Sequence, residues 1–136
     1  MNGDGAPRLE VEFPNLRPEV IEGYRSAPEG AVAEVVGGEL SVRPRPRTAH
    51  AAAASILGEE LGPPFRRGRG GPGGWVFLDE PELRLGPTPE VLVPDLAGWR
   101  RDRVPTDFLE RAFVDIAPDW ICEVLSPSTE AFDHVA

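Results

Sequence analysis

Two stretches decide how this sequence folds: EVLVPDLAGWR at residues 90–100 and PDWICEVLSPST at residues 118–129. Each is an apolar run that carries one carboxylate in its middle, Asp95 in the first and Glu123 in the second. A charge inside an apolar strand costs free energy unless a partner compensates it. Because the two predicted strands are consecutive, they can pair and bring both acids to one end of a sheet.

The pattern leaves two interpretations of these acids open. Neighbouring carboxylates repel each other, so a divalent cation is a natural partner, and oxygen ligands completed by water suit Mg²⁺ or Mn²⁺. Alternatively, the acids bind backbone amides or the side chains of Arg100 and Arg101. In the metal interpretation the carboxylates should lie about 4–6 Å apart. Alanine at either position should then weaken Mn²⁺ binding without destabilising the fold, because like charges are removed.

The remaining patterns predict a helix, a hairpin, a second helix, three strands and the start of a last helix. The first helix is expected in RPEVIEGYRSAP, and the hairpin in AVAEVVGGELSV, turning at Gly37-Gly38. The second helix covers TAHAAAASILGEELG, capped by Thr48, with an apolar stripe that includes Ile56, and ended by Gly62 and two prolines. The strands are WVFLDEPELRLG, EVLVPDLAGWR and DWICEVLS. The connection between the last two strands is expected to include a short helical turn, and the last helix starts in SPSTEAFDHVA. This order is typical of an α/β protein of the mixed α+β class.

Composition sets limits on the kind of protein. A chain of 136 residues, 40% of them hydrophobic, is long enough for one core, and we expect a flexible tail over residues 1–16 before a domain over residues 17–136. The formal charge of −9 argues against a generic nucleic-acid coat but leaves local patches open, and all 14 basic residues are arginines. We find no signal peptide and no apolar run of about 18 residues, so a cytoplasmic location is expected.

Three smaller features have competing explanations. The loop GRGGPGG matches G-x-G-x-x-G at Gly68, Gly70 and Gly73, but a dinucleotide site needs a strand before this motif and a helix after it. A phosphate-contacting Arg/Gly loop and a plain mobile hairpin loop remain, the second being the default. Cys122 is expected to be a small buried hydrophobe. His50, in the first turn of a helix, is expected to be neutral, as a metal-site neighbour, a phosphate contact or a packing residue.

Four blocks in order carry a family resemblance: AEVVGGELSVRPRPRTAH, GGWVFLDEPELRLG, VLVPDLAGWRR and PDWICEVLSPST. Over about residues 18–136 the chain resembles the PD-(D/E)xK nuclease superfamily, and within it the bacterial Uma-type restriction-endonuclease-like proteins. The resemblance implies a mixed sheet flanked by helices and the metal-dependent hydrolysis of DNA phosphodiester bonds. A carboxylate-bound Mg²⁺ can activate water and stabilise developing negative charge in such a reaction.

The resemblance also implies roles for individual residues. Asp95 and Glu123 match the catalytic acids that hold Mg²⁺ or Mn²⁺, and Glu39 and Glu82 match further acidic positions near the catalytic site. His50 matches the histidine that opens the first long helix. With His50, the arginines of the local clusters are expected to contact nucleic acid: Arg45, Arg47, Arg66, Arg67 and Arg69.

One position departs from the superfamily pattern. A lysine usually stands two residues after the second acid, where this chain has Leu125. In the Uma-type branch the lysine follows the aspartate matched by Asp133, which would place it just past Ala136. We therefore expect a shortened form whose last helix and strand are incomplete. Three hypotheses remain: an endonuclease, a non-catalytic relic that binds nucleic acid or a partner chain, and an interaction domain in which the acids pair with arginines.

The last predicted strand has consequences for assembly. Residues 118–126 are apolar on both faces, so the strand is expected to need cover on both sides. An open apolar sheet edge invites another chain. We therefore expect a homo-oligomer or a marginally stable chain with little nuclease activity.

Overall fold

The computed structural model describes residues 15–45, 47–88 and 90–125, which divide into two compact units. Unit 1 comprises residues 15–45, 82–88, 90–93 and 111–117. Unit 2 comprises residues 47–81, 94–110 and 118–125. The start of the predicted tail and the predicted last helix lie outside the described residues. No helix in the described part of the chain is long and apolar enough to cross a membrane.

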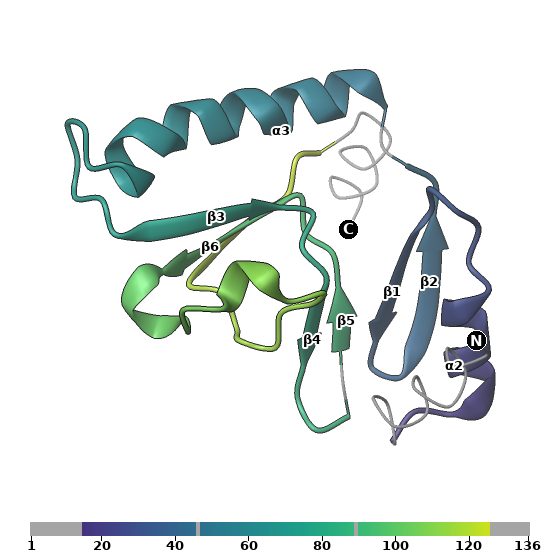
Figure 1. The fold of residues 1–136 in the computed structure, drawn as a ribbon. Coiled ribbons are helices and arrows are strands. Elements are labelled where there is room, and N and C mark those ends of the chain that lie inside the picture. Colours follow the sequence, from purple (N-terminus) through teal and green to yellow (C-terminus); the bar gives the residue numbers. More distant parts are fainter. Residues whose placement is uncertain (1–14, 46, 89, 126–136) are drawn as a thin grey trace. The chain divides into compact units, whose positions relative to one another are not determined.

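Unit 1 is a four-stranded antiparallel sheet with one helix (Figure 1). The strand order is β2 (Glu39–Arg43), β1 (Val32–Val36), β5 (Glu90–Leu92) and β4 (Leu83–Leu85). An isolated parallel bridge joins Leu83 to Val114. The helix α2 (Pro18–Arg25) has its proline in the first turn and contacts β1 and β2, as the sequence predicts.

The core of unit 1 forms from α2 and the central strands. Its buried side chains are those of Leu16, Val20, Ile21, Val35 and Val91. Leu16, the last residue of the predicted tail, is 8% exposed and belongs to this core. The hairpin is confirmed, because Val36 pairs with Glu39 and both intervening glycines have positive φ, 59° and 81°. Such a turn matches the twist of the two strands.

Unit 2 combines a three-stranded antiparallel sheet with a long helix that lies along one side of it (Figure 1). The strand order is β3 (Trp75–Asp79), β6 (Leu96–Arg100) and β7 (Trp120–Cys122). The helix α3 (Thr48–Leu61) runs into a π-helical turn (Gly62–Arg66). Two 3-10 turns (Arg101–Arg103 and Phe108–Glu110) provide the short helical structure predicted between the last two strands.

Two predicted strands are each divided in the structure. WVFLDEPELRLG gives β3 in unit 2 and β4 in unit 1, and EVLVPDLAGWR gives β5 in unit 1 and β6 in unit 2. Pro81 follows β3, and Pro94 lies between β5 and β6. Proline has no amide donor for a sheet ladder, so an apolar run that contains one is readily interrupted there. The prediction of each run as a single strand was therefore wrong.

The long helix is confirmed, but its ends differ from the prediction. Thr48 lies inside the first turn, and the cap position belongs to Arg47, which makes no side-chain cap hydrogen bond. The chain does not stop turning at Gly62, because a π-helical turn accommodates Pro63 and Pro64. The predicted apolar stripe is not buried among the described residues: Ile56 is 58% exposed and no α3 residue is buried.

The sheet of unit 2 has two different faces. On one face Trp99 is fully buried and packs edge-to-face on Phe108, with ring centroids 5.1 Å apart. The opposite face carries Gly98, which pairs with Phe77 of β3 and with Trp120 of β7. A Cβ atom at position 98 would lie 2.8 Å from the Phe77 ring. The absence of a side chain at Gly98 therefore leaves room for the aromatic rings of the neighbouring strands.

Exchanging glycine for alanine at two places in unit 2 should have opposite effects on stability. Gly98→Ala should lower the free energy of unfolding by about 1–3 kcal/mol, because it overpacks the sheet against Phe77. Gly58→Ala is the matched control within α3, where a Cβ meets nothing within 4 Å. It should raise the free energy of unfolding by about 0.5–1 kcal/mol. Urea denaturation measures both, and equal effects would contradict the assigned packing.

Candidate active site at the ends of β6 and β7

The two acids singled out in the sequence lie at the same end of the unit 2 sheet. Asp95 directly precedes β6 and Glu123 directly follows β7. These strands pair antiparallel, with Leu96 opposite Cys122. The predicted pairing of the two stretches is thus confirmed, and the antiparallel register brings the two carboxyl-bearing residues together.

Each acid is hydrogen-bonded to the backbone of the other strand's end. The amide of Asp95 donates to Oε1 of Glu123 at 3.0 Å, and the amide of Val124 donates to Oδ2 of Asp95 at 2.7 Å. Asp95 is buried at 7% exposure, whereas Glu123 is exposed. Hydrogen bonds between an amide and a carboxylate are charge-assisted and therefore stronger than neutral ones. The reciprocal pair holds both side chains at the sheet end.

His50 completes this group from the first turn of α3. Its Nε2 lies 2.8 Å from Oδ1 of Asp95, and both side chains are largely buried, with exposures of 13% and 9%. Since the carboxylate only accepts hydrogen bonds, Nε2 carries the proton in this contact. Both oxygens of Asp95 are thereby bound, one to His50 and the other to the amide of Val124.

Cys122 lies between the acids and the centre of the sheet. Burial raises the pKa of its thiol, and the negative charges of Asp95 and Glu123 raise that pKa further. A thiol with a raised pKa is a poor nucleophile at neutral pH, because the thiolate is the reactive form. Cys122 is half-buried, so it is less buried than the sequence predicted.

The other predicted acids belong to unit 1 and have partners there. Glu39 is exposed at the start of β2, and its Oε1 lies 3.5 Å from Nη2 of Arg17. Glu82 pairs with Arg84 and binds Tyr24, whose pKa is raised by burial and next by the bond to Glu82. Both acids thus have ion-pair partners in unit 1, and their catalytic role remains a prediction.

The predicted nucleic-acid contacts are distributed over both units. Arg45 belongs to unit 1 and donates to the carbonyl of Gly30 at 3.5 Å. In unit 2, Arg47 precedes α3, and the exposed side chains of Arg66, Arg67 and Arg69 follow along its π-helical turn and the loop after it. The structure describes no salt bridge for these three.

The loop that carries these arginines is built by its own backbone. The amides of Arg67, Arg69 and Gly73 donate to the carbonyls of Gly62, Pro63 and Pro64. The loop links a π-helical turn to β3, so the default prediction of a hairpin loop was wrong. The G-x-G-x-x-G match has neither a strand before it nor a helix after it and lacks the context of a dinucleotide site.

Sequence reasoning missed one half-buried acid. Glu34 lies within β1 in unit 1, where its Oε2 accepts from the amide of Val93 at 2.8 Å and its Oε1 lies 3.5 Å from Arg43. The signal was the same as for Asp95, since VAEVV is also an apolar run with one internal charge. Applying that criterion to every strand would have found it.

The donor set at the sheet end fits a hard divalent cation. No three His, Cys, Asp or Glu side chains among the described residues form a complete metal-binding group. Magnesium, however, is commonly held by one or two carboxylates together with waters and substrate phosphates. Asp95 and Glu123 provide two carboxylates, and each carboxylate oxygen can accept more than one contact. The residues present therefore fit such an ion.

Comparisons with known proteins agree with this description. A family model described as Uma2, putative restriction endonuclease, matches residues 21–136. Among solved structures, a putative nuclease belonging to DUF820 from Anabaena variabilis is similar, with a TM-score of 0.62 and 22% identity. The similarity covers 84% of this chain and 64% of that chain, and at this identity it concerns the fold. It confirms the predicted α+β, nuclease-like fold. No curated protein is similar enough to count as a relative.

Removing either acid should affect stability differently. Asp95→Ala should lower the free energy of unfolding by about 1–3 kcal/mol, because the Val124 amide and His50 lose their acceptor in a buried place. This reverses the sequence-based expectation of an unchanged fold. Glu123→Gln keeps an oxygen for the Asp95 amide and should change stability by less than about 0.5 kcal/mol. Denaturation curves that rank the two variants in the opposite order would contradict the assignment.

Proposed function

Because the chain belongs to the Uma2 family of putative restriction endonucleases, we propose that it is a divalent-metal-dependent endonuclease that hydrolyses phosphodiester bonds in DNA. Mg²⁺ or Mn²⁺ is the proposed ion, and Asp95 and Glu123 are the proposed ligands. The observation that carries the proposal is the convergence of these carboxylates at one end of the β6–β7 pair, where the Asp95 amide donates to Glu123 and the Val124 amide donates to Asp95.

The chain's own residues have defined tasks in this proposal. The ion, when bound, supplies Lewis-acid stabilisation of a phosphate oxygen and lowers the pKa of a bound water. The amide of Val124 and Nε2 of His50 hold both oxygens of Asp95, which fixes the orientation of the carboxylate. Glu123 is exposed, so its carboxylate is accessible to an ion that also contacts the substrate. The proton on His50 Nε2 stays toward Asp95, so His50 is a positioning residue.

Substrate binding is assigned to the arginines of unit 2. Arg66, Arg67 and Arg69 are exposed next to one another along the chain. Guanidinium groups bind phosphate in a fixed, often bidentate geometry. These arginines can therefore attract a polyanionic strand locally, even though the chain as a whole carries a formal charge of −9.

One observation favours a second candidate function, a non-catalytic domain that binds nucleic acid. The position of the usual superfamily lysine holds Leu125, and all 14 basic residues of the chain are arginines. A lysine in this superfamily's site would stabilise charge on the phosphate as a point charge. Binding of nucleic acid does not require such a lysine, so cleavage and binding have to be measured separately.

Cleavage of a supercoiled plasmid in Mn²⁺ or Mg²⁺ tests the proposal. We expect nicking by the wild-type chain, none in excess chelator, and none by Asp95→Asn or Glu123→Gln. His50→Gln should reduce activity or metal affinity by about 10–100-fold, because a group that orients a ligand is lost. Glu110→Gln is the matched control, since it removes one charge from an exposed position. Metal-dependent DNA binding without nicking would favour the non-catalytic candidate, and nicking by both acid variants would overturn the site.

The salt dependence of DNA binding tests the arginine loop. Replacing Arg66, Arg67 and Arg69 together by alanine should make the slope of log K against log salt shallower. For duplex DNA, the slope should fall by about 0.9 for every phosphate that the variant no longer neutralises, because fewer counterions are released. Fluorescence anisotropy over a salt series measures the slope, and an unchanged slope would mean that the loop does not bind phosphate.

A further inference from the structure

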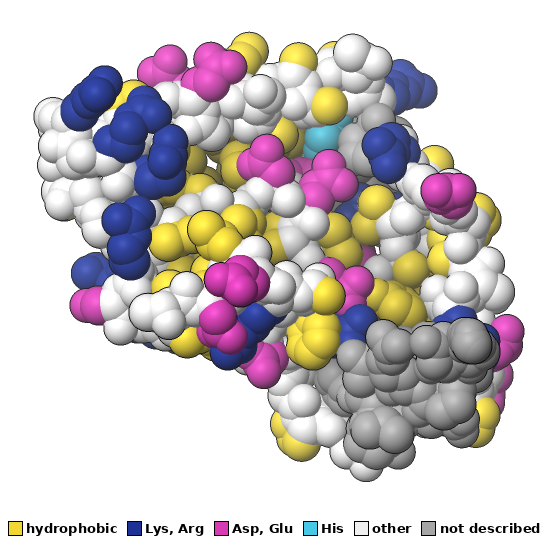
Figure 2. Space-filling view, viewed as in Figure 1, with side chains coloured by type: hydrophobic (Ala, Val, Ile, Leu, Met, Phe, Trp, Pro, Cys, Tyr) yellow, Lys and Arg dark blue, Asp and Glu magenta, His cyan; other side chains and the backbone are white. Residues whose placement is uncertain are grey.

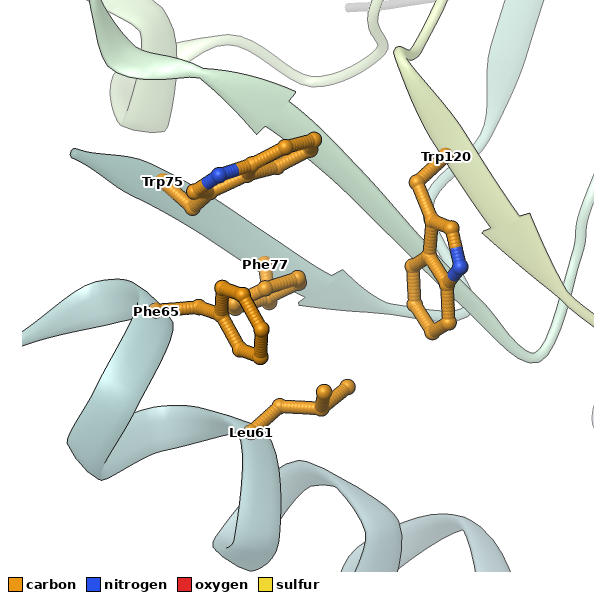
Figure 3. A pocket seen from close by; sticks show the side chains of 5 residues that line it. All are labelled: Leu61, Phe65, Trp75, Phe77 and Trp120. Carbon is orange, nitrogen blue, oxygen red and sulfur yellow. The ribbon is translucent and has the colours of Figure 1, made fainter. Parts of the chain in front are cut away.

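An open apolar pocket on the unit 2 sheet has no role in the site described above. It is lined by Leu61, Phe65, Trp75, Phe77 and Trp120, and the space inside it measures about 90 Å³ (Figure 3). Three of its aromatic side chains come from β3 and β7, and Figure 3 shows the other two residues approaching from α3 and the π-helical turn.

Gly98 creates the floor of this pocket. It lies on β6 directly between Phe77 and Trp120, and its missing side chain lets these two rings meet edge-to-face at 6.0 Å. Trp75 lies parallel to Phe77, with an interplanar angle of 4° and ring centroids 6.0 Å apart. The arrangement gives flat aromatic faces with fixed directions around an empty space.

These aromatic rings are not fully buried, although the same sheet buries aromatic rings elsewhere. Trp99 on the opposite face has an exposure of 0%, whereas Phe65 is 36% exposed and Trp75, Phe77 and Trp120 are half-buried. Aromatic side chains gathered at an open hollow, with polar residues at its rim, are typical of a binding surface.

One arginine, Arg100, lies against a ring of the pocket, and three others lie close to Phe65 along the chain. Arg66 follows Phe65 directly in the π-helical turn, with Arg67 and Arg69 beyond it, and the guanidinium of Arg100 lies 5.6 Å from the centroid of the Trp75 ring. The structure describes no salt bridge for any of these four side chains. Figure 2 shows basic side chains gathered at this end of unit 2. An apolar floor beside such cations suits a flat ring attached to a phosphate.

The pocket also lies on the same strands as the acidic pair. Gly98 is three residues from Asp95 along the chain, and Trp120 is three residues from Glu123. Three residues of an extended strand span about 10 Å. The helix α3 contributes Leu61 to the pocket and His50 to the contact with Asp95, so the pocket and the Asp95 carboxylate both lie toward α3. The separation is the scale of a single nucleotide, so a base in the pocket would place its backbone near the acids.

We propose that the aromatic pocket receives an unpaired nucleobase, which stacks between Phe65, Trp75 and Trp120 while Arg66 and Arg100 contact the adjoining phosphates. The proposal rests on the proposed function and specifies its substrate as a strand with unstacked bases, either single-stranded or locally opened. Stacking on aromatic side chains is sequence-tolerant, since every base has a flat face. The positive charges of Arg100 and of the arginines that follow Phe65 favour this occupant over an apolar peptide or a second copy of the chain.

The test compares two labelled strands of equal length and charge, one of oligodeoxythymidine and one made wholly of abasic residues. Fluorescence anisotropy is recorded in chelator, so that no cleavage takes place. We expect the wild-type chain to bind the thymidine strand about tenfold more tightly or better, because base stacking contributes that much. Phe65→Leu and Trp120→Leu should lose most of this preference and keep abasic binding. Phe113→Leu is the matched control, because Phe113 packs on Arg84 in unit 1, outside the pocket.

A second measurement needs no variant. Photo-crosslinking with 5-bromodeoxyuridine in the strand should attach the wild-type chain at Phe65, Trp75 or Trp120, as located by mass spectrometry. Equal binding of both strands, no binding of either, or crosslinks only outside residues 61–77 and 118–122 would overturn the proposal. The two proposals can fail separately: cleavage without a base preference leaves the nuclease and removes the pocket, and a base preference without cleavage does the reverse.

Discussion

The reciprocal hydrogen bonds between Asp95 and the end of β7 are the constraint on which the site depends. The Asp95 amide donates to Glu123 and the Val124 amide donates to Asp95, so each strand end supplies both a carboxylate and a donor. A buried carboxylate without such donors would be costly. The same bonds that satisfy this charge also hold two like charges at one sheet end. This is where a divalent cation would relieve their repulsion, so structural and proposed catalytic roles coincide in the same atoms.

A second constraint is the missing side chain at Gly98. Strand β6 begins directly after Asp95 and has Gly98 three residues beyond it. Because glycine has no side chain, Phe77 and Trp120 can meet across the strand at this position. The acidic end and the aromatic pocket are therefore two features of one short β6–β7 ladder. In the proposed function the two features have different roles: the carboxylates at the end of the ladder hold the ion that acts on the phosphate, and the pocket receives the base. Changes to β6 should affect both.

Much of this was predictable from the sequence because it depends on local pattern. Apolar runs with one internal charge located Asp95 and Glu123, and their order along the chain predicted the pairing. The hairpin at Gly37-Gly38 and the helix from Pro18 follow from turn and capping chemistry. The breaks at Pro81 and Pro94 could have been predicted too, since proline interrupts a sheet ladder. They were missed because the apolar pattern continues across both prolines.

The remaining features depend on tertiary contacts that no local pattern contains. His50 reaches Asp95 across 45 residues of sequence. The role of Gly98 depends on which residues of β3 and β7 lie opposite it. The aromatic residues of the pocket look like ordinary core residues in the sequence, and only their exposure distinguishes them from Trp99. The expectation that Asp95 is dispensable for stability also came from counting charges without the hydrogen bonds.

The most direct test of the proposed metal site is the anomalous scattering of Mn²⁺ soaked into crystals of the chain. We expect a peak within coordination distance of carboxylate oxygens from both Asp95 and Glu123, with His50 and the Val124 amide still bound to Asp95. The peak should disappear in crystals of Glu123→Gln. An occupied Mn²⁺ site elsewhere on the chain, with both carboxylates bound only to their backbone amides, would contradict the proposed site.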